Sequence, residues 1–234
     1  MGKWIAFMAM VLMNFILIAQ EPFSVHEYAN FAKYAEANMA AGAPADGEDR
    51  VVFMGNSITE SWVRYSPAFF EKNAYIGRGI SGQVTHQMLL RFRADVIDLN
   101  PKAVVILAGI NDIAQNSGFV ELMEIFANIK SMAELAAQNG IKVVLCSVLP
   151  AIDFPWRPGL EPAQKVVQLN QMLRNYAAEK DYPYVDYFSA MADDKDGLKV
   201  PEYTSADDLV HPNKAGYDVM EGLVQKGILA ALGK

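Results

Sequence analysis

Cysteine is almost absent from this sequence, because Cys146 is the single one among 234 residues. One cysteine cannot form a disulfide within the chain, so we expect the fold to depend on its hydrophobic core alone. Cys146 also lies inside the apolar run at residues 143–148, which favours a packing role over a catalytic one.

Histidine is scarce too, and the familiar metal and nucleotide motifs are missing. The three histidines are His26, His86 and His211. The sequence contains no H-E-x-x-H motif for a metal ion, no P-loop for a nucleotide, and no G-x-S-x-G motif of the kind that surrounds the serine of α/β-hydrolases. We therefore expect chemistry that needs neither a metal ion nor a cofactor. His86 falls within a predicted helix, where it is either an ordinary helix residue or part of the rim of a site.

Positive charge is in deficit. The sequence has 20 lysines and arginines and 27 acidic residues, which gives a formal net charge of −7 at pH 7, and no basic cluster occurs. This distribution argues against nucleic acid and against anionic membrane surfaces as partners.

One long apolar run is present at the N-terminus. It follows Lys3 and continues to Ala19, interrupted at Asn14. A basic start and an apolar centre predict a secretory signal peptide over residues 1–20, with export to the periplasm or the medium and no stable membrane insertion after cleavage. The alternative is an uncleaved N-terminal helix that anchors the protein, because the run approaches the length of a spanning helix.

Residues 21–234 are expected to form one domain in which strands and helices alternate. The patterns predict strands at 51–54, 74–76, 103–108, 141–148 and 184–186, and helices near 25–41, 59–65, 85–99, 119–138, 162–179 and 212–232. Continuous Val/Ile/Leu strands followed by helices are typical of a parallel sheet covered on both faces. The predicted fold class is therefore α/β, a three-layer α/β/α sandwich with five strands.

Ser57 is predicted to stand where the first of these strands gives way to a helix, in Gly55-Asn56-Ser57. The carboxyl end of a parallel strand borders the ligand crevice, and a helix N-terminus adds unpaired N–H groups. A purely structural alternative exists, because Ser57 and Glu60 have the spacing of a capping box.

Three further polar segments fall at strand ends or helix starts and should converge on the same sheet edge. They are Arg78-Gly79-Ile80-Ser81-Gly82-Gln83, Ala108-Gly109-Ile110-Asn111-Asp112, and Asp208-Leu209-Val210-His211-Pro212-Asn213.

Together the four segments supply the groups that acyl transfer by a serine requires. His211 can activate the Ser57 hydroxyl, and Asp208 can orient the imidazole. The Ser57 N–H, the Gly82 N–H and the Asn111 amide can stabilise an oxyanion. Taken singly, His211, Asn111 and Gly82 are better explained by a surface position or by turns; their joint occurrence favours catalysis.

These segments resemble, in order, the four sequence blocks of the SGNH hydrolase superfamily, also called GDSL-type lipases and acylhydrolases. The resemblance extends from residue 51 to the C-terminus and implies a flavodoxin-like sheet and ester hydrolysis through an acyl-enzyme. It implies Ser57 as nucleophile, Asp208 and His211 as the Asp-x-x-His element, and Gly82 and Asn111 as oxyanion donors. Asn56 departs from the family pattern, which has Asp before the serine; we expect the change to affect local structure.

A proline-rich loop at 149–161 offers side chains for a substrate. Phe154 and Trp156 can stack on a sugar ring and Arg157 can donate hydrogen bonds to its hydroxyls, although the loop could equally be a hydrophobic flap. The expected function is that of a secreted serine esterase that removes small acyl groups, acetyl above all, from carbohydrate. The alternatives are a lysophospholipase or acyl-thioesterase with the same mechanism, and a non-catalytic carbohydrate-binding protein on the same fold.

Overall fold

The computed structural model describes residues 23–234. The signal peptide predicted over residues 1–20 lies outside the described residues. Within residues 23–234, no helix combines the length and the apolar character that crossing a membrane requires.

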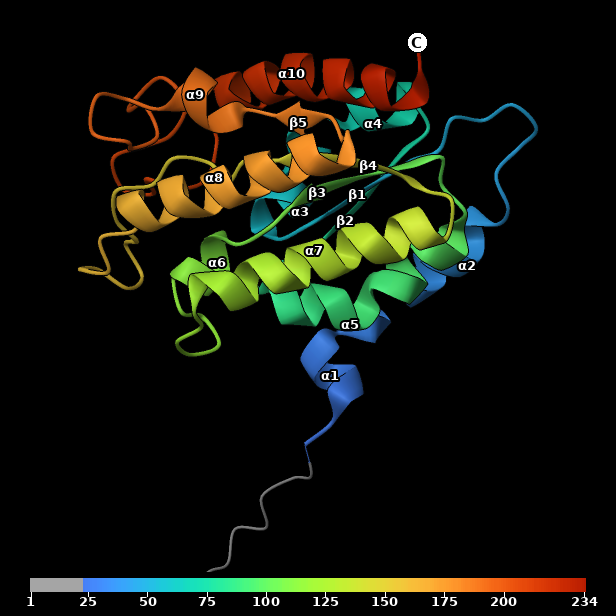
Figure 1. Ribbon diagram of the computed structural model, residues 1–234, viewed down its shortest axis with the longest axis horizontal. Helices are drawn as coiled ribbons and strands as arrows, with labels where there is room; N and C mark the ends of the chain where they lie inside the picture. Colours follow the sequence, from blue (N-terminus) through green and yellow to red (C-terminus); the bar gives the residue numbers. More distant parts are fainter. Residues whose placement is uncertain (1–22) are drawn as a thin grey trace, which may run out of the picture.

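A parallel sheet of five strands forms the centre of the described chain (Figure 1). The strands are β1 (Val51–Gly55), β2 (Tyr75–Gly79), β3 (Ala103–Leu107), β4 (Lys142–Cys146) and β5 (Tyr184–Val185), in the spatial order β2-β1-β3-β4-β5. This is the flavodoxin-like order, so the predicted fold class is confirmed. Gly55 pairs with Gly79 of β2 and with Leu107 of β3, which brings the carboxyl ends of three strands level.

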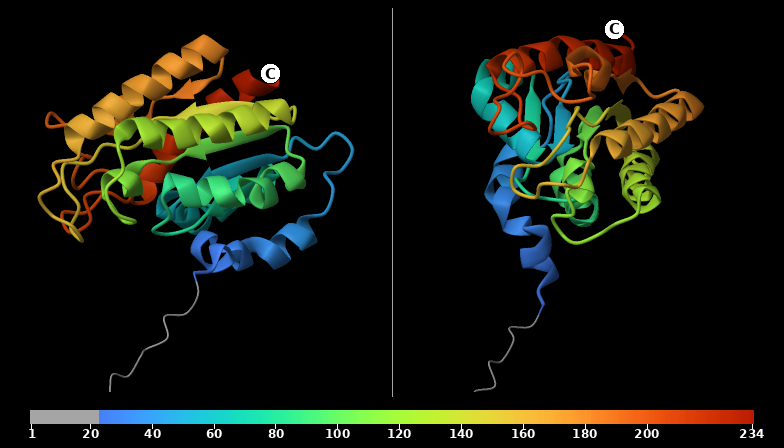
Figure 2. Two further views of the ribbon diagram at one scale, coloured as in Figure 1. Left: turned by 60° about the horizontal axis from the view of Figure 1, so that its bottom comes forward. Right: turned by 90° about the vertical axis from the view of Figure 1, so that its left-hand side faces the viewer.

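Helices cover both faces of the sheet, which is why every residue of β1 and β3 is buried. On one face lie α3 (Ser57–Tyr65), α4 (Pro67–Lys72), α9 (Tyr187–Met191) and α10 (Lys214–Leu232). The other face carries α5 (Thr85–Asp95), α7 (Leu122–Gln138) and α8 (Ala163–Lys180). Figure 2 shows the resulting three layers, and its right-hand view faces the loops at the carboxyl ends of the strands.

The N-terminal helix predicted over residues 25–41 is wrong as a single element. Asn30 adopts a left-handed conformation, with φ of 55°, and divides the segment into α1 (Val25–Ala29), the 3-10 helix η1 (Phe31–Tyr34) and α2 (Ala35–Ala41). Asparagine tolerates this conformation because its short polar side chain can hydrogen-bond locally. Apolar spacing alone does not reveal such a break.

Other helix boundaries also differ from the prediction. The helix expected to reach residue 99 ends at Asp95 and is followed by the 3-10 helix η2 (Ile97–Leu99). Pro212 was expected at the first position of the last helix, but α10 begins at Lys214 because the Asn213 side chain accepts from the Gly216 N–H and caps it. The short helices α4, α6 (Ile110–Ile113) and α9 were not predicted.

Candidate active site

Ser57 is the first residue of α3, directly after β1. The cap of this helix is Asn56, whose Oδ1 accepts a hydrogen bond from the Ile58 N–H at 3.1 Å. The capping-box alternative for Ser57 is therefore wrong, and Glu60 accepts instead from the backbone N–H and the hydroxyl of Ser81. Asn56 is thus the N-cap of α3, a role that requires an acceptor oxygen but not the negative charge of an aspartate.

Two glycines allow α3 to begin this close to the sheet. A Cβ on Gly55 would lie 2.1 Å from Thr59 Oγ1, and one on Gly79 would lie 2.3 Å from the Glu60 nitrogen. Both distances are far inside van der Waals contact, so a side chain at either position would push the start of α3 away from the strand ends.

His211 lies beside Ser57, with Nε2 2.8 Å from the serine Oγ. On the other side of the ring, Nδ1 lies 2.8 Å from Asp208 Oδ1. The three predicted residues therefore form a continuous hydrogen-bonded line at the carboxyl edge of the sheet, although Ser57 and His211 are 154 positions apart in sequence.

The loop before α10 fixes the His211 ring in this position. Asp208 Oδ1 also accepts from the backbone N–H groups of Val210, at 3.2 Å, and His211, at 2.8 Å. Leu209 takes up the left-handed conformation, with φ of 63°, that closes this turn. The Thr204 hydroxyl donates to the His211 carbonyl at 2.8 Å and ties the loop down from the other side.

Gly82 and Asn111, the other two predicted oxyanion donors, come from the loop after β2 and from α6, respectively. Gly82 is exposed and has a φ of +79°, which favours glycine. Asn111 is buried on α6, and its Nδ2 donates to the carbonyl of Gln83 at 3.0 Å. Asn116 also reaches this loop, because its Nδ2 lies 3.4 Å from the Gly82 carbonyl.

A buried arginine that the sequence did not single out supports this edge of the sheet. Arg91 of α5 is fully buried and donates to the carbonyls of Gly55 and Arg78, both at 3.0 Å. It also donates to Gln83 Oε1 at 2.6 Å and to Asp95 Oδ2 at 2.7 Å. One side chain thus joins the ends of β1 and β2 to the loop that carries Gly82.

Asp112 makes a second connection that sequence inspection missed. Its carboxylate accepts from the Thr85 N–H at 3.0 Å and from the Thr85 hydroxyl at 2.6 Å, which fastens α6 to the N-terminus of α5. Burial raises the pKa of Asp112 to about 6, in spite of these donors. The arrangement anchors the helix that carries Asn111.

The loop at 149–161 reaches the site through Trp156. The Trp156 ring is 45% exposed, its centroid lies 6.2 Å from that of His211, and its Nε1 donates to Asn116 Oδ1 at 3.1 Å. Arg157 donates to the Gln115 carbonyl at 2.5 Å. Phe154 is fully buried beneath Trp156, so its predicted contact with a sugar is wrong.

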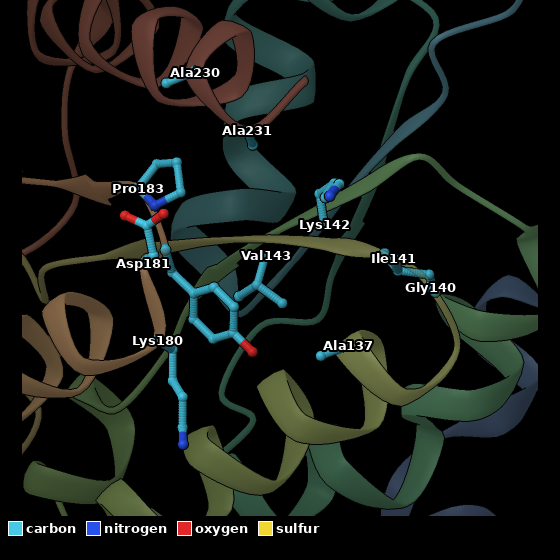
Figure 3. A pocket seen from close by; sticks show the side chains of 11 residues that line it. Ala137, Gly140, Ile141, Lys142, Val143, Lys180, Asp181, Pro183, Ala230 and Ala231 are labelled. Carbon is cyan, nitrogen blue, oxygen red and sulfur yellow. The ribbon is translucent and has the colours of Figure 1, made fainter. Parts of the chain in front are cut away.

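A pocket of about 420 Å³ contains Ser57 and His211. Its lining combines polar groups with apolar surface and comprises Ser57, Ser61, Arg64, Tyr65, Ser81, Ser205, Asp208, His211, Pro212 and Asn213. A larger hollow of about 650 Å³ lies at the opposite edge of the sheet, where β4 and β5 begin (Figure 3). That hollow has no serine, histidine or cysteine in its lining and is unsuited to acyl transfer.

The remaining candidates have structural roles. His86 stacks on Tyr28 with ring centroids 5.6 Å apart, so it belongs to the contact between α1 and α5. Cys146 is buried, and burial raises the pKa of its thiol to about 12, in keeping with the predicted packing role. Across residues 23–234, no cluster of three or more His, Cys, Asp or Glu side chains is placed to hold a metal ion.

Comparison with known proteins adds a family match. The model of the GDSL-like lipase/acylhydrolase family matches residues 53–219. The fold is similar to that of a GDSL-like lipase from Bacteroides thetaiotaomicron, with 51% identity, a TM-score of 0.84, and coverage of 87% of this chain and 99% of the other. A candidate acylhydrolase from Bacteroides fragilis gives 50% identity, a TM-score of 0.84, and coverage of 87% and 98%.

One curated relative is the uncharacterized lipoprotein YqeF of Bacillus subtilis. It is 30% identical over 132 residues, which are 49% of this chain and 54% of the lipoprotein. The match therefore spans about half the length of that relative.

Proposed function

Since this chain belongs to the GDSL-like lipase/acylhydrolase family, we propose that it is a serine esterase that works through an acyl-enzyme. The observation that carries the proposal is the line from Ser57 Oγ through His211 to Asp208 Oδ1, with both heavy-atom distances at 2.8 Å. A nucleophile, a base and a group that orients the base are the elements that such catalysis requires.

The proposed mechanism requires one particular tautomer of the His211 ring. A carboxylate has no proton to donate, so Nδ1 must carry the hydrogen that lies between it and Asp208. In the neutral imidazole Nε2 then has a free lone pair, which accepts the hydrogen bond of the Ser57 hydroxyl. His211 is thereby ready to act as a general base.

In the proposed first half-reaction, Ser57 Oγ forms a bond to the ester carbonyl carbon while its proton passes to Nε2 of His211. The tetrahedral intermediate then breaks the bond to the alcohol oxygen, which takes the proton from Nε2 as it leaves. In the second half-reaction, a water molecule gives a proton to Nε2 as its oxygen bonds to the acyl carbon. The bond between that carbon and Ser57 Oγ then breaks, Oγ takes the proton back from Nε2, and the carboxylic acid leaves.

Three donors are proposed for the oxyanion of that intermediate. The Ser57 N–H belongs to the first turn of α3 and has no partner within the helix. The Asn111 amide has two N–H donors, and the Gln83 carbonyl takes one of them, which leaves the other. The Gly82 N–H completes the set.

The substrate proposed is a small acyl ester, acetyl above all, of a carbohydrate. Two observations support it: the pocket that holds Ser57 presents several hydroxyl groups, an amide and a guanidinium, and the half-exposed Trp156 ring lies beside His211. An aromatic face can pack on the apolar side of a sugar ring, and Arg157 adds N–H donors near it.

A second candidate, a lysophospholipase or acyl-thioesterase, is favoured by a different feature. A hollow of about 300 Å³ beside α6 has an apolar wall that would suit a longer acyl chain. The residues of that wall are Ile113, Phe119, Val120, Leu122 and Ile125.

Export is proposed from the N-terminal run, with cleavage near residue 20 and, as the alternative, retention through an uncleaved anchor. The Bacillus subtilis relative is a lipoprotein, but the single cysteine of this chain, Cys146, is buried in β4 and does not follow the apolar run. N-terminal sequencing of the exported protein should begin at Gln20 or Glu21; an intact Met1 in the membrane fraction would support anchoring.

The function is tested by incubating the protein with acetylated xylan, pectin and sialic acid fragments beside lysophospholipids and acyl-thioesters. Acetate release that falls in a Trp156→Ala variant would support the carbohydrate ester. Hydrolysis restricted to long-chain lipids or thioesters would support the second candidate. Sugar binding without hydrolysis of any ester would instead identify a binding protein.

A further inference from the structure

One side of α3 faces the pocket beside the catalytic serine. Ser57, Ser61, Arg64 and Tyr65 all line that pocket. Their spacing of four, seven and eight residues from Ser57 places them on the same face of the helix. A group bound along this face would therefore extend from the reacting serine toward Arg64 and Tyr65.

The Arg64 guanidinium is folded back along the helix toward Ser57. Its Nη2 donates to Ser61 Oγ at 2.8 Å, and Ser61 lies about one helical turn, or ~5.4 Å, from Ser57. Among the ion pairs formed by residues 23–234, none involves Arg64. A positive charge with several unused N–H donors thus lies within the pocket.

Tyr65 forms an aromatic wall next to this charge. The ring is 50% exposed and stacks on Tyr217, with centroids 5.3 Å apart and planes 27° from parallel. Tyr217 is itself buried, and its hydroxyl donates to the Ile58 carbonyl at 2.8 Å. Because its support is fixed, Tyr65 offers a pre-ordered face to a ring.

We propose that this pocket holds the alcohol part of the ester and that Arg64 selects alcohols bearing an anionic group. The inference rests on the proposed esterase function. Planar guanidinium recognises carboxylate, phosphate and sulfate through paired, charge-assisted hydrogen bonds, which an ordinary sugar hydroxyl cannot match. Asp208, the acidic residue of the pocket, is already engaged by His211 and by backbone N–H groups, so it leaves Arg64 available.

The overall charge of the protein opposes the approach of such a substrate. The chain has a formal net charge of −7, so an anionic ester is repelled from its surface as a whole. A local positive charge beside Ser61, in the pocket that contains Ser57, would offset that repulsion at the place where the alcohol binds. The expected substrate class is an acylated acidic sugar rather than a neutral one.

The test compares esters that differ only in the charged group. The kcat/KM values are measured for methyl glucuronide and methyl glucoside that carry one acetyl group at the same position, with a mono-acetylated sugar phosphate as a third arm. Wild-type enzyme should favour an anionic ester at least ~10-fold over the glucoside. Arg64→Gln should lose roughly 10- to 100-fold on that anionic ester and much less on the glucoside, because only the charged bond is removed.

Arg93→Gln is the matched control, since it removes the same charge from a 65% exposed side chain on α5 outside the pocket. It should leave both kcat/KM values unchanged.

Binding is measured separately, by the protection of Ser57 from reaction with a fluorophosphonate. Glucuronate should protect the wild-type enzyme better than glucose does. The Arg64→Gln variant should show no such difference. Preference for the sugar phosphate over the uronide would support the cation site and assign phosphate as its anion.

Two results would overturn the inference while leaving the proposed function intact. Wild-type enzyme could hydrolyse the charged and neutral esters with equal kcat/KM, or Arg64→Gln could lower both by the same factor. If wild-type enzyme hydrolyses no ester and Ser57 is not labelled, the esterase function itself fails and this inference fails with it.

Discussion

Asp208 holds His211 at two points with a single oxygen. Its Oδ1 accepts from the ring Nδ1 and from the backbone N–H of His211, each at 2.8 Å. The backbone contact sets where the carboxylate lies, and the ring contact sets how the imidazole is turned. Ring and carboxylate are therefore aligned before any substrate arrives.

Replacing Asp208 by Asn keeps an acceptor oxygen and removes the negative charge. An amide oxygen in the place of Oδ1 can still accept from the backbone N–H groups and from Nδ1, but a neutral amide does not stabilise the imidazolium that forms when Nε2 takes the Ser57 proton. If the amide is turned over, its N–H faces Nδ1 and favours the tautomer whose Nε2 already carries a proton. We expect kcat to fall by about 10³- to 10⁴-fold with an unchanged circular dichroism spectrum. Asp207→Asn, at the exposed neighbour, should retain full activity. Equal activity of the two variants would remove Asp208 from the proposed mechanism.

Asn111→Ala tests the oxyanion donors. Loss of one such donor should lower kcat by roughly 10²- to 10³-fold. The Gln83 carbonyl loses its partner as well, so the free energy of unfolding should drop by about 1–3 kcal/mol. Steady-state kinetics and urea unfolding on the same sample separate the two effects. If kcat does not change while stability drops, Asn111 has a structural role alone.

Arg91→Met tests the network behind the strand ends. The change leaves the buried Asp95 carboxylate without its ion pair and the Gly55 and Arg78 carbonyls without a donor. The free energy of unfolding should fall by about 3–5 kcal/mol. Arg93→Met, two positions along and exposed, should stay within about 0.5 kcal/mol of wild type. A loss below 1 kcal/mol in Arg91→Met would mean that the network is not needed for stability.

Asp112 should make stability depend on pH in a defined direction. Burial raises its pKa from 3.8 to about 6, so between these values the folded protein holds the proton more tightly than the unfolded chain. The stabilisation from this proton is full below about pH 4 and is lost as the pH rises through about 6. Relative to Asp112→Asn, wild type should lose on the order of 3 kcal/mol between pH 4 and pH 7. Urea unfolding at several pH values measures this, and parallel curves for the two proteins would contradict it.

Much of the fold could be predicted because its signals are local in sequence. The apolar runs that begin at Val51 and Ala103 are strands buried on both faces, and Asn139 and Gly140 mark the end of a helix. The four polar segments follow strands or precede helices, and level strand ends bring them to one edge. That is enough to place Ser57 and His211 together without knowledge of the tertiary structure.

The missed features depend on long-range packing or on single backbone angles. Arg91 lies in a helical pattern where a charged residue is expected to face solvent. Its burial is explained by acceptors that the fold brings to it, namely the carbonyls of β1 and β2 and the side chains of Gln83 and Asp95. Phe154 and Trp156 are two residues apart with the same aromatic character, yet one is buried and the other half-exposed. The left-handed turn at Asn30 depends on one φ angle that a hydrophobic pattern does not record.

The most direct test of the account is intact-mass and peptide mapping after treatment with a fluorophosphonate that reacts with activated serines. The proposed mechanism predicts one adduct on Ser57, its absence in Ser57→Ala together with loss of ester hydrolysis, and its persistence in Ser61→Ala, one turn along the same helix face. An adduct on any other residue, or ester hydrolysis that survives in Ser57→Ala, would contradict the assignment of Ser57 as the nucleophile.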